Sequence, residues 1–180
     1  MLERAFRLGE CAHYETATIA HNLRERADAH VQRDTVLSVV GNDLPNVAAE
    51  DYPWCTQYLP EWLHRGARLR YYALNPSGKA LAGLRRLHAD FPEQVEVRVP
   101  TAEAAADDQA AQFLRLWQTY HFAVFENVPQ LWVETHHPVG EREAKDCYYF
   151  PPAHAMEQPL YDLCKLQFNG MFEKFGQDAL

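Results

Sequence analysis

Hydrophobic and polar positions alternate along the first half of the chain in a way that predicts strands separated by helices. Residues 35–40 (TVLSVV) form a near-continuous β-branched run, which is typical of a strand buried on both faces. Further strands are predicted at residues 68–74 and 95–99, and Leu81, Leu84 and Leu87 recur between them at helical spacing. Strands that alternate with helices favour parallel pairing.

The second half of the chain changes this pattern. Strands are predicted at residues 121–125 and 130–134, and the intervening turn predicts that they form a hairpin. A last short strand at residues 146–150 stops at Pro151 and Pro152. The final helix carries an apolar stripe that includes Phe168 and Phe172, and we expect Gly176 to end it.

The predicted fold class is therefore α/β, with a mostly parallel sheet, helices on both faces and a C-terminal hairpin. Apolar residues from Leu8 to Ala27, including Ala12, recur at helical spacing, so residues 1–30 are predicted to be a helical segment. The chain has 180 residues, of which 47% are hydrophobic. That composition supports one core, and we expect residues 1–180 to form a single domain.

Charge and cysteine content limit the expected partners and cellular compartment of the protein. The formal net charge is -8, which repels phosphate backbones, so we expect no nucleic-acid partner and no anionic membrane, although this balance leaves room for a local basic patch. The apolar runs include neither a signal peptide nor a membrane span. The four cysteines form no close pair, which favours free thiols in a reducing, cytoplasmic compartment.

The order of these elements resembles one half of the phospholipase-D-like fold. Residues 65–70 (RGARLR) match the arginine-flanked strand of that family, and the strand at 95–99 and the hairpin at 121–134 follow in the expected order. The resemblance implies a phosphodiesterase site with a histidine nucleophile and a phosphate-holding lysine in an HxK motif. It also implies a homodimer, because two copies of the motif normally meet.

The motif itself is degenerate in both registers that we compared. If His121 is the motif histidine, Ala123 occupies the lysine position and Val128 the aspartate position. If Glu126 takes the place of the aspartate, Thr119 replaces the nucleophile. A phosphate oxyanion without its cation loses most of its stabilisation, so catalysis by the family's mechanism is not expected.

Polar residues at the ends of two predicted parallel strands are candidate ligand contacts. Asn42 and Asp43 follow the first strand, and Asn75 and Ser77 follow the second. Ligands of open α/β sheets bind at the carboxyl ends of the strands. The same residue types also form turns and helix caps, which explains each of them without a ligand.

The chain contains no recognisable cofactor or metal motif, so we expect neither. His136 and His137 follow Glu134, but neighbouring residues of a strand point to opposite faces and cannot easily chelate one ion. No phosphate-binding glycine loop or dinucleotide fingerprint is present.

Three functional hypotheses follow. The first is a non-catalytic phospholipase-D-like module, a homodimer that recognises a protein partner or a small ligand. The second is a divergent phosphodiesterase or nuclease that uses His121 with Glu126 or Glu134. The third is an accessory protein of a mobile element or a defence system, with no small-molecule site.

Overall fold

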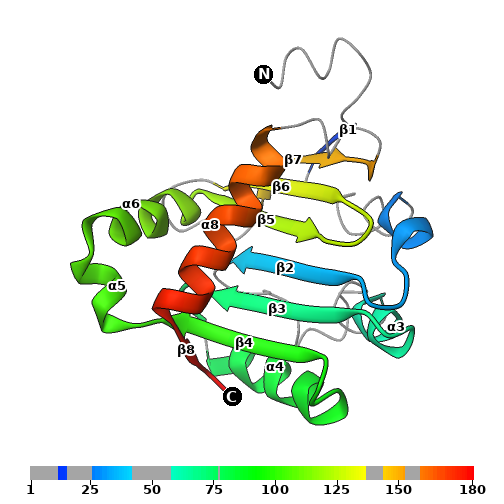
Figure 1. Ribbon diagram of the computed structural model, residues 1–180, viewed down its shortest axis with the longest axis horizontal. Coiled ribbons are helices and arrows are strands. Elements are labelled where there is room, and N and C mark those ends of the chain that lie inside the picture. Colours follow the sequence, from blue (N-terminus) through cyan, green and yellow to red (C-terminus); the bar gives the residue numbers. More distant parts are fainter. Residues whose placement is uncertain (1–11, 16–25, 42–57, 77, 137–143, 153–158) are drawn as a thin grey trace.

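The computed structural model describes residues 12–15, 26–41, 58–76, 78–136, 144–152 and 159–180 (Figure 1). Its centre is an eight-stranded sheet in the order β1-β7-β6-β5-β2-β3-β4-β8. The strands are β1 (Ala12–Glu15), β2 (Val36–Gly41), β3 (Arg68–Ala73), β4 (Val95–Pro100), β5 (Tyr120–Phe125), β6 (Gln130–His136), β7 (Ala144–Phe150) and β8 (Gly176–Asp178). The helices are η2 (Asp28–His30), α3 (Leu59–His64), α4 (Gly78–Asp90), α5 (Ala102–Ala106), α6 (Asp108–Trp117) and α8 (Pro159–Phe175).

The α/β class is correct, but the prediction of a mostly parallel sheet is wrong. Only β2–β3 and β3–β4 pair in parallel among the strands described. After β4 the chain passes through α5 and α6 and returns on the other side of β2, where β5 pairs antiparallel. The predicted β5–β6 hairpin is confirmed, and β7 extends it. A strand buried on both faces looks the same in sequence whichever way its neighbour runs, so pattern alone could not decide the direction.

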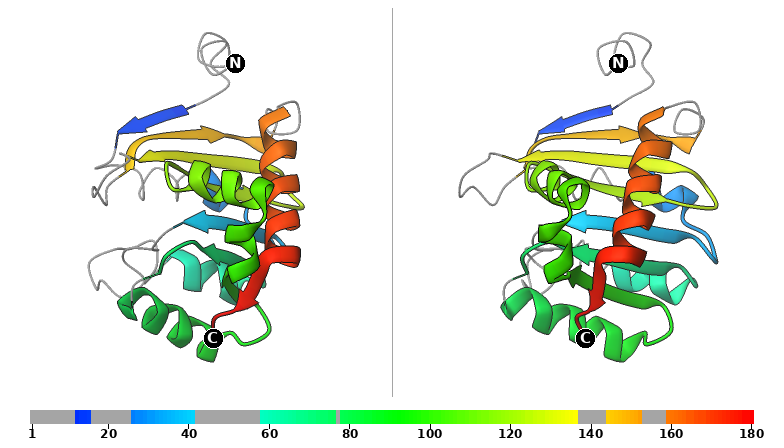
Figure 2. Two further views of the ribbon diagram at one scale, coloured as in Figure 1. Left: turned by 90° about the vertical axis from the view of Figure 1, so that its left-hand side faces the viewer. Right: turned by 60° about the vertical axis from the view of Figure 1, so that its left-hand side comes forward.

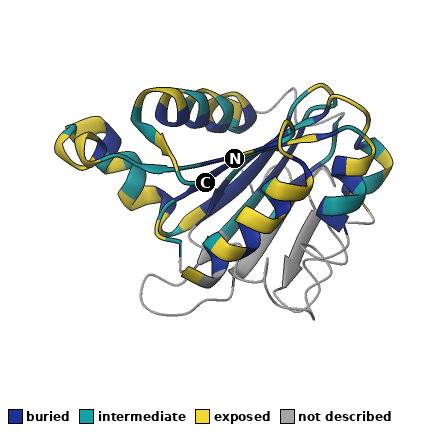
Figure 3. Cartoon of the chain, turned by 90° about the horizontal axis from the view of Figure 1, so that it is seen from below, coloured by how far each residue is buried: buried dark blue, intermediate teal, exposed yellow. Residues whose placement is uncertain are grey.

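Helices cover both faces of the sheet, as predicted, and divide the core in two. One cluster joins β2, β3, β4 and β5 to η2, α3 and α4, with Trp62, Tyr71 and Phe125 among its buried residues. The other joins the opposite face to α5, α6 and α8, and includes Trp117 and Phe172. Helix α8 crosses the strands on this second face (Figures 1 and 2). Buried strand residues therefore lie between helices whose outward residues are exposed (Figure 3).

The prediction of a helix throughout residues 1–30 is wrong at residues 12–15, although residues 26–30 are helical as expected. Residues Ala12–Glu15 form β1, which pairs antiparallel with β7 at the edge of the sheet. Ala12 was part of the helical series, but one alanine in a weak apolar pattern carries little information. Pairing with an otherwise open edge strand supplies backbone hydrogen bonds that a local pattern cannot predict.

The end of the chain is held to the sheet by a group that we call the C-terminal clamp: Arg70, Arg98, Phe172 and Glu173. Each guanidinium carbon lies 4.5 Å from the centre of the Phe172 ring. Both arginines form ion pairs with Glu173, and Arg98 also donates to the Phe172 carbonyl over 2.7 Å. The clamp therefore combines ion pairs, cation–π contacts and a hydrogen bond to a carbonyl in the last turn of α8.

Gly176 ends α8 as predicted and then begins a strand that the sequence did not reveal. A Cβ atom there would lie 2.5 Å from the Phe172 carbonyl oxygen, so only glycine fits this approach. The three residues from Gly176 pair antiparallel with β4. So short a strand has no periodicity of its own, and only the neighbouring edge of β4 makes it form.

Candidate functional site

The structure brings together His121 and Glu134, two of the three proposed catalytic residues. They are register partners on β5 and β6, and their side chains lie on the same face of the sheet. His121 is only 8% exposed. The Glu134 carboxylate accepts a hydrogen bond of 2.8 Å from the indole Nε1 of Trp132. Each polar group is thus held inside a packed face of the sheet.

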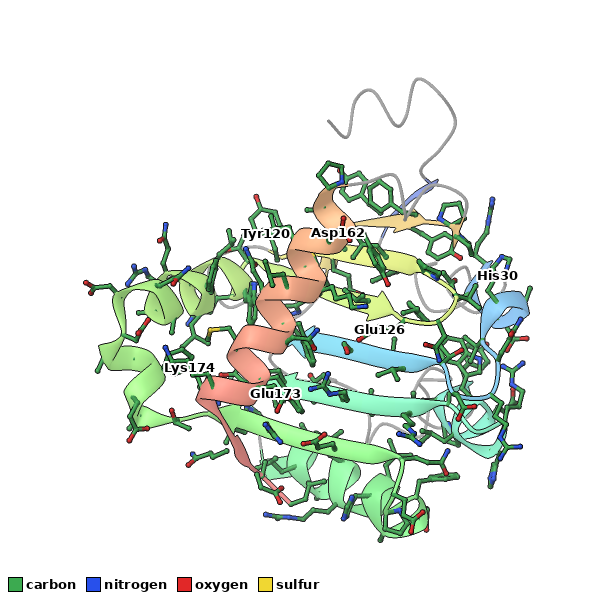
Figure 4. The ribbon with its side chains drawn as sticks, in the orientation of Figure 1. His30, Tyr120, Glu126, Asp162, Glu173 and Lys174 are labelled. Atoms are coloured by element: carbon green, nitrogen blue, oxygen red, sulfur yellow. The ribbon has the colours of Figure 1, made fainter. Side chains whose placement is uncertain are left out.

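Glu126, the third proposed catalytic residue, lies apart from His121. Glu126 is five positions further along the chain, just after the end of β5, so its side chain follows the opposite face of the strand. Its carboxylate forms an ion pair of 2.7 Å with Lys165 of α8. The label in Figure 4 places Glu126 beside α8, and the hypothesis that combined it with His121 is not supported by this geometry.

The surroundings of His121 favour a structural role. A Cβ atom at Gly41 would lie 3.8 Å from the imidazole Nδ1 and 3.0 Å from the Tyr71 hydroxyl, so β2 passes close to both rings. Ala123, at the lysine position of the expected motif, is buried in the same core cluster. A phosphate here would meet packed rings and the Glu134 carboxylate, and the position of the motif lysine, which would supply the cation, holds Ala123.

The predicted ligand residues at the strand ends are mostly outside the described part of the chain. Asn42, Asp43 and Ser77 lie outside the described residues. Asn75 is described, is exposed, and follows β3 at the carboxyl edge of the sheet. The structure therefore places one of the four residues at the predicted edge, and their role as ligand contacts stays a prediction.

A different feature appears at the opposite edge, where β2 and β3 begin. Exposed arginines come from three places in the chain: the residues around η2, the turn before β2, and the end of α3. We call this group the arginine rim: Arg26, Arg33, Arg65 and Arg68. Helix η2 lies on the side marked by His30 in Figure 4, and α3 lies at the same end of the sheet in Figure 1. The fold thus brings chain segments that carry four exposed arginines, spread over more than forty residues of sequence, to this end of the sheet.

The backbone beneath the rim is tightly fixed. Gly66 follows the end of α3 and has a φ of 94°. A residue with a side chain would be strained in this left-handed conformation. The space above it is filled by Arg33, whose Cγ would lie 3.0 Å from a Cβ at Gly66. The Arg68 amide donates to the Thr35 carbonyl over 2.8 Å, and the Asp34 amide donates to Gly66 over 3.0 Å.

Acidic groups lie among these arginines. Arg65 forms an ion pair with Asp28, whose Oδ1 also accepts a hydrogen bond of 2.8 Å from the indole Nε1 of Trp62. Asp34 is exposed and has a φ of 67°. Arg65 therefore has a carboxylate partner, whereas Arg33 and Arg68 project from the same rim as exposed cations.

The sequence pattern did not predict the rim. The one sequence feature that could have indicated the rim is that Arg33, Arg65 and Arg68 each lie next to the end of a predicted helix or strand. Charged residues are common at such places, because the ends of elements face solvent. Only the parallel pairing of β2 with β3 brings these three ends to one edge.

Comparison with known proteins gives one informative result. No family model matches the chain, and no curated protein matches it either. A solved structure of TrmBL2, an archaeal chromatin protein described as showing a novel mode of DNA binding, is similar with a TM-score of 0.55 and 13% sequence identity. The similarity covers 98% of this chain and 58% of that chain, so this chain spans little more than half of the length of its structural relative.

This comparison overturns several of the sequence-based expectations. It shows a fold shared with part of TrmBL2, and nothing in it supports the phospholipase-D-like resemblance. The non-catalytic module for a protein or small ligand is contradicted, and its two alternatives fit no better. The exclusion of nucleic acid was also wrong in its reasoning, because net charge averages over the whole surface and says nothing of a local group of arginines.

The sequence also predicted no membrane span. Within the residues described, no helix is both long enough and apolar enough to cross a membrane.

Proposed function

We propose that this chain is a DNA-associating domain that contacts the phosphate backbone of duplex DNA through the arginine rim. The observation that carries the proposal is that Arg33 and Arg68 are both exposed and that their backbone segments are hydrogen-bonded to each other at the edge where β2 and β3 begin. The similarity of nearly the whole chain to a DNA-binding chromatin protein supports it.

The chemistry of the rim suits phosphate. A guanidinium group is always charged and donates two parallel hydrogen bonds to a phosphate. The backbone that carries Arg33 and Arg68 is fixed by the bonds around Gly66 and Thr35, so less order has to be gained on binding. Contacts of this kind position a protein on DNA without reading its sequence.

The net charge of -8 limits this binding but does not prevent it. At an ionic strength of 0.1 M, charges separated by more than about 10 Å are largely screened from each other. A phosphate in contact with Arg68 is therefore affected mainly by the rim, and far less by acidic groups elsewhere. We expect weak binding that depends strongly on salt and little on base sequence.

Fluorescence anisotropy with a labelled duplex of mixed sequence tests the proposal. Arg33→Gln and Arg68→Gln should each weaken binding, and together they should reduce the slope of log K against log salt by about 2, since each lost phosphate contact removes about 0.9 from the slope. Arg115→Gln is the matched control, because Arg115 is an exposed arginine on α6, which covers the other face of the sheet. Equal loss in all three variants, or no binding by the parent protein, would contradict the proposal.

A further inference from the structure

We infer that Asp28 is an internal competitor for phosphate at the arginine rim, so that it restrains DNA binding by occupying Arg65. The inference rests on the proposed function. It assigns opposite roles to neighbouring rim residues: Arg33 and Arg68 bind DNA directly, whereas Arg65 becomes available only when its pair with Asp28 opens.

The pair is placed where a ligand can reach it. The side chains of Arg65 and Asp28 are 40% and 37% exposed, so the ion pair is at the surface. Exposed ion pairs of this kind contribute little net stability, because water and salt compete with them. A DNA phosphate offers Arg65 a partner of the same charge and similar geometry, and can therefore replace the carboxylate.

Asp28 nevertheless cannot leave the rim when the ion pair opens. Its Oδ1 is held by the indole Nε1 of Trp62, and Trp62 is only 1% exposed in the core. The negative charge therefore stays next to Arg65 and repels an incoming phosphate. Glu61, one turn earlier on α3, is the other carboxylate near Arg65 on its own helix.

The decisive variant is Asp28→Asn, which keeps an oxygen acceptor for Trp62 and removes the charge. DNA affinity should rise about fivefold, since unit charges about 4 Å apart in water interact by about one kilocalorie per mole. In an Arg65→Gln background the same substitution should produce no gain, because the cation it frees is absent. Circular dichroism of each variant checks that the fold is intact.

Asp34→Asn is the matched control for a general effect of charge. Asp34 lies in the same rim and takes a left-handed backbone conformation that asparagine adopts readily. Its substitution removes the same unit of charge without freeing Arg65, so it should raise affinity by less than Asp28→Asn. A second comparison does not depend on the folding of any Asp28 variant: in the parent protein, Arg65→Gln should weaken binding less than Arg68→Gln.

The outcomes separate this inference from the proposed function. A gain in Asp28→Asn that disappears in the Arg65→Gln background supports the inference. If Arg33→Gln and Arg68→Gln weaken binding but Asp28→Asn has no effect, or no more than Asp34→Asn, the inference is wrong and the proposed function stands. If the parent protein shows no rim-dependent DNA binding, both are wrong.

Discussion

The C-terminal clamp and the arginine rim use the same side chain for different purposes. In the clamp, Arg70 and Arg98 are 21% and 24% exposed and lie against the Phe172 ring, with ion pairs to Glu173. In the rim, Arg33 and Arg68 are exposed and project from a fixed backbone. The clamp arginines hold α8 on the sheet, whereas Arg33 and Arg68 of the rim are exposed to solvent. The number of arginines therefore says little about function. The groups around each guanidinium determine whether it stabilises the fold or faces solvent.

The largest expected effect concerns the aromatic core beneath the clamp. Phe168 is 1% exposed, and its ring stacks on Phe172 with 5.0 Å between the ring centres. Phe168→Ala should lower the free energy of unfolding by about 3–5 kcal/mol, because it removes a buried ring and leaves a cavity. Urea denaturation measures the change. Leu166→Ala on the same helix is the control, since Leu166 is 73% exposed and its loss should change little.

The comparison itself is tested by substituting one arginine from each group. Arg70→Ala should destabilise the fold by about 1–3 kcal/mol, because it loses its contacts with Phe172 and a hydrogen bond to Asn169. Arg68→Ala should change stability by less than about 0.5 kcal/mol, as expected of an exposed site. Denaturation and DNA titration of both variants should show opposite patterns. If Arg68→Ala proved the more destabilising of the two, the division between clamp and rim would be wrong.

Alkaline pH should weaken the clamp side of the molecule. Burial raises the pKa of Tyr72, whose hydroxyl donates to the Phe175 carbonyl over 3.1 Å, to about 12 from an ordinary value of 10.0. Because the folded pKa is higher than the unfolded one, the stabilisation is complete below pH 10 and is lost as the pH rises from 10 towards 12. Urea midpoints at pH 9, 10 and 11, on the parent protein and on Tyr72→Phe, measure this loss. A fall of the same size in Tyr72→Phe would show that other groups cause it.

The smallest expected effect concerns the reactivity of a cysteine and not the stability of the fold. Cys164, buried in α8, is a free thiol, and burial raises its pKa to about 12. Iodoacetamide at pH 8 should leave it unmodified in the folded protein, because the thiolate is the reactive form, and should modify it after denaturation. Mass spectrometry distinguishes the two states. After denaturation without reductant, we also expect Cys11, Cys55 and Cys147 to be modified as free thiols; failure of any pair to react would indicate a disulfide.

Much of the local structure could be predicted from sequence. The β-branched run at residues 35–40, the turn between β5 and β6, and the apolar stripe of α8 each depend on neighbouring residues, and each element formed where it was expected. The errors concern pairing. The direction of β5 beside β2, the short strand β8 and the edge strand β1 depend on which backbone edges remain open, and that is settled by distant segments.

The same distinction between local sequence and long-range pairing applies to the candidate site. The sequence by itself determined that the lysine of a phosphodiesterase motif is missing at Ala123, because this is a matter of residue identity. It could not determine that Glu126 would be separated from His121 and bound to Lys165, or that arginines from separate segments would meet at one edge. Such groupings arise when parallel strands align their ends across the sheet. The physical reason is that side-chain identity fixes which interactions are possible, whereas only the folded chain fixes which groups are near enough to make them.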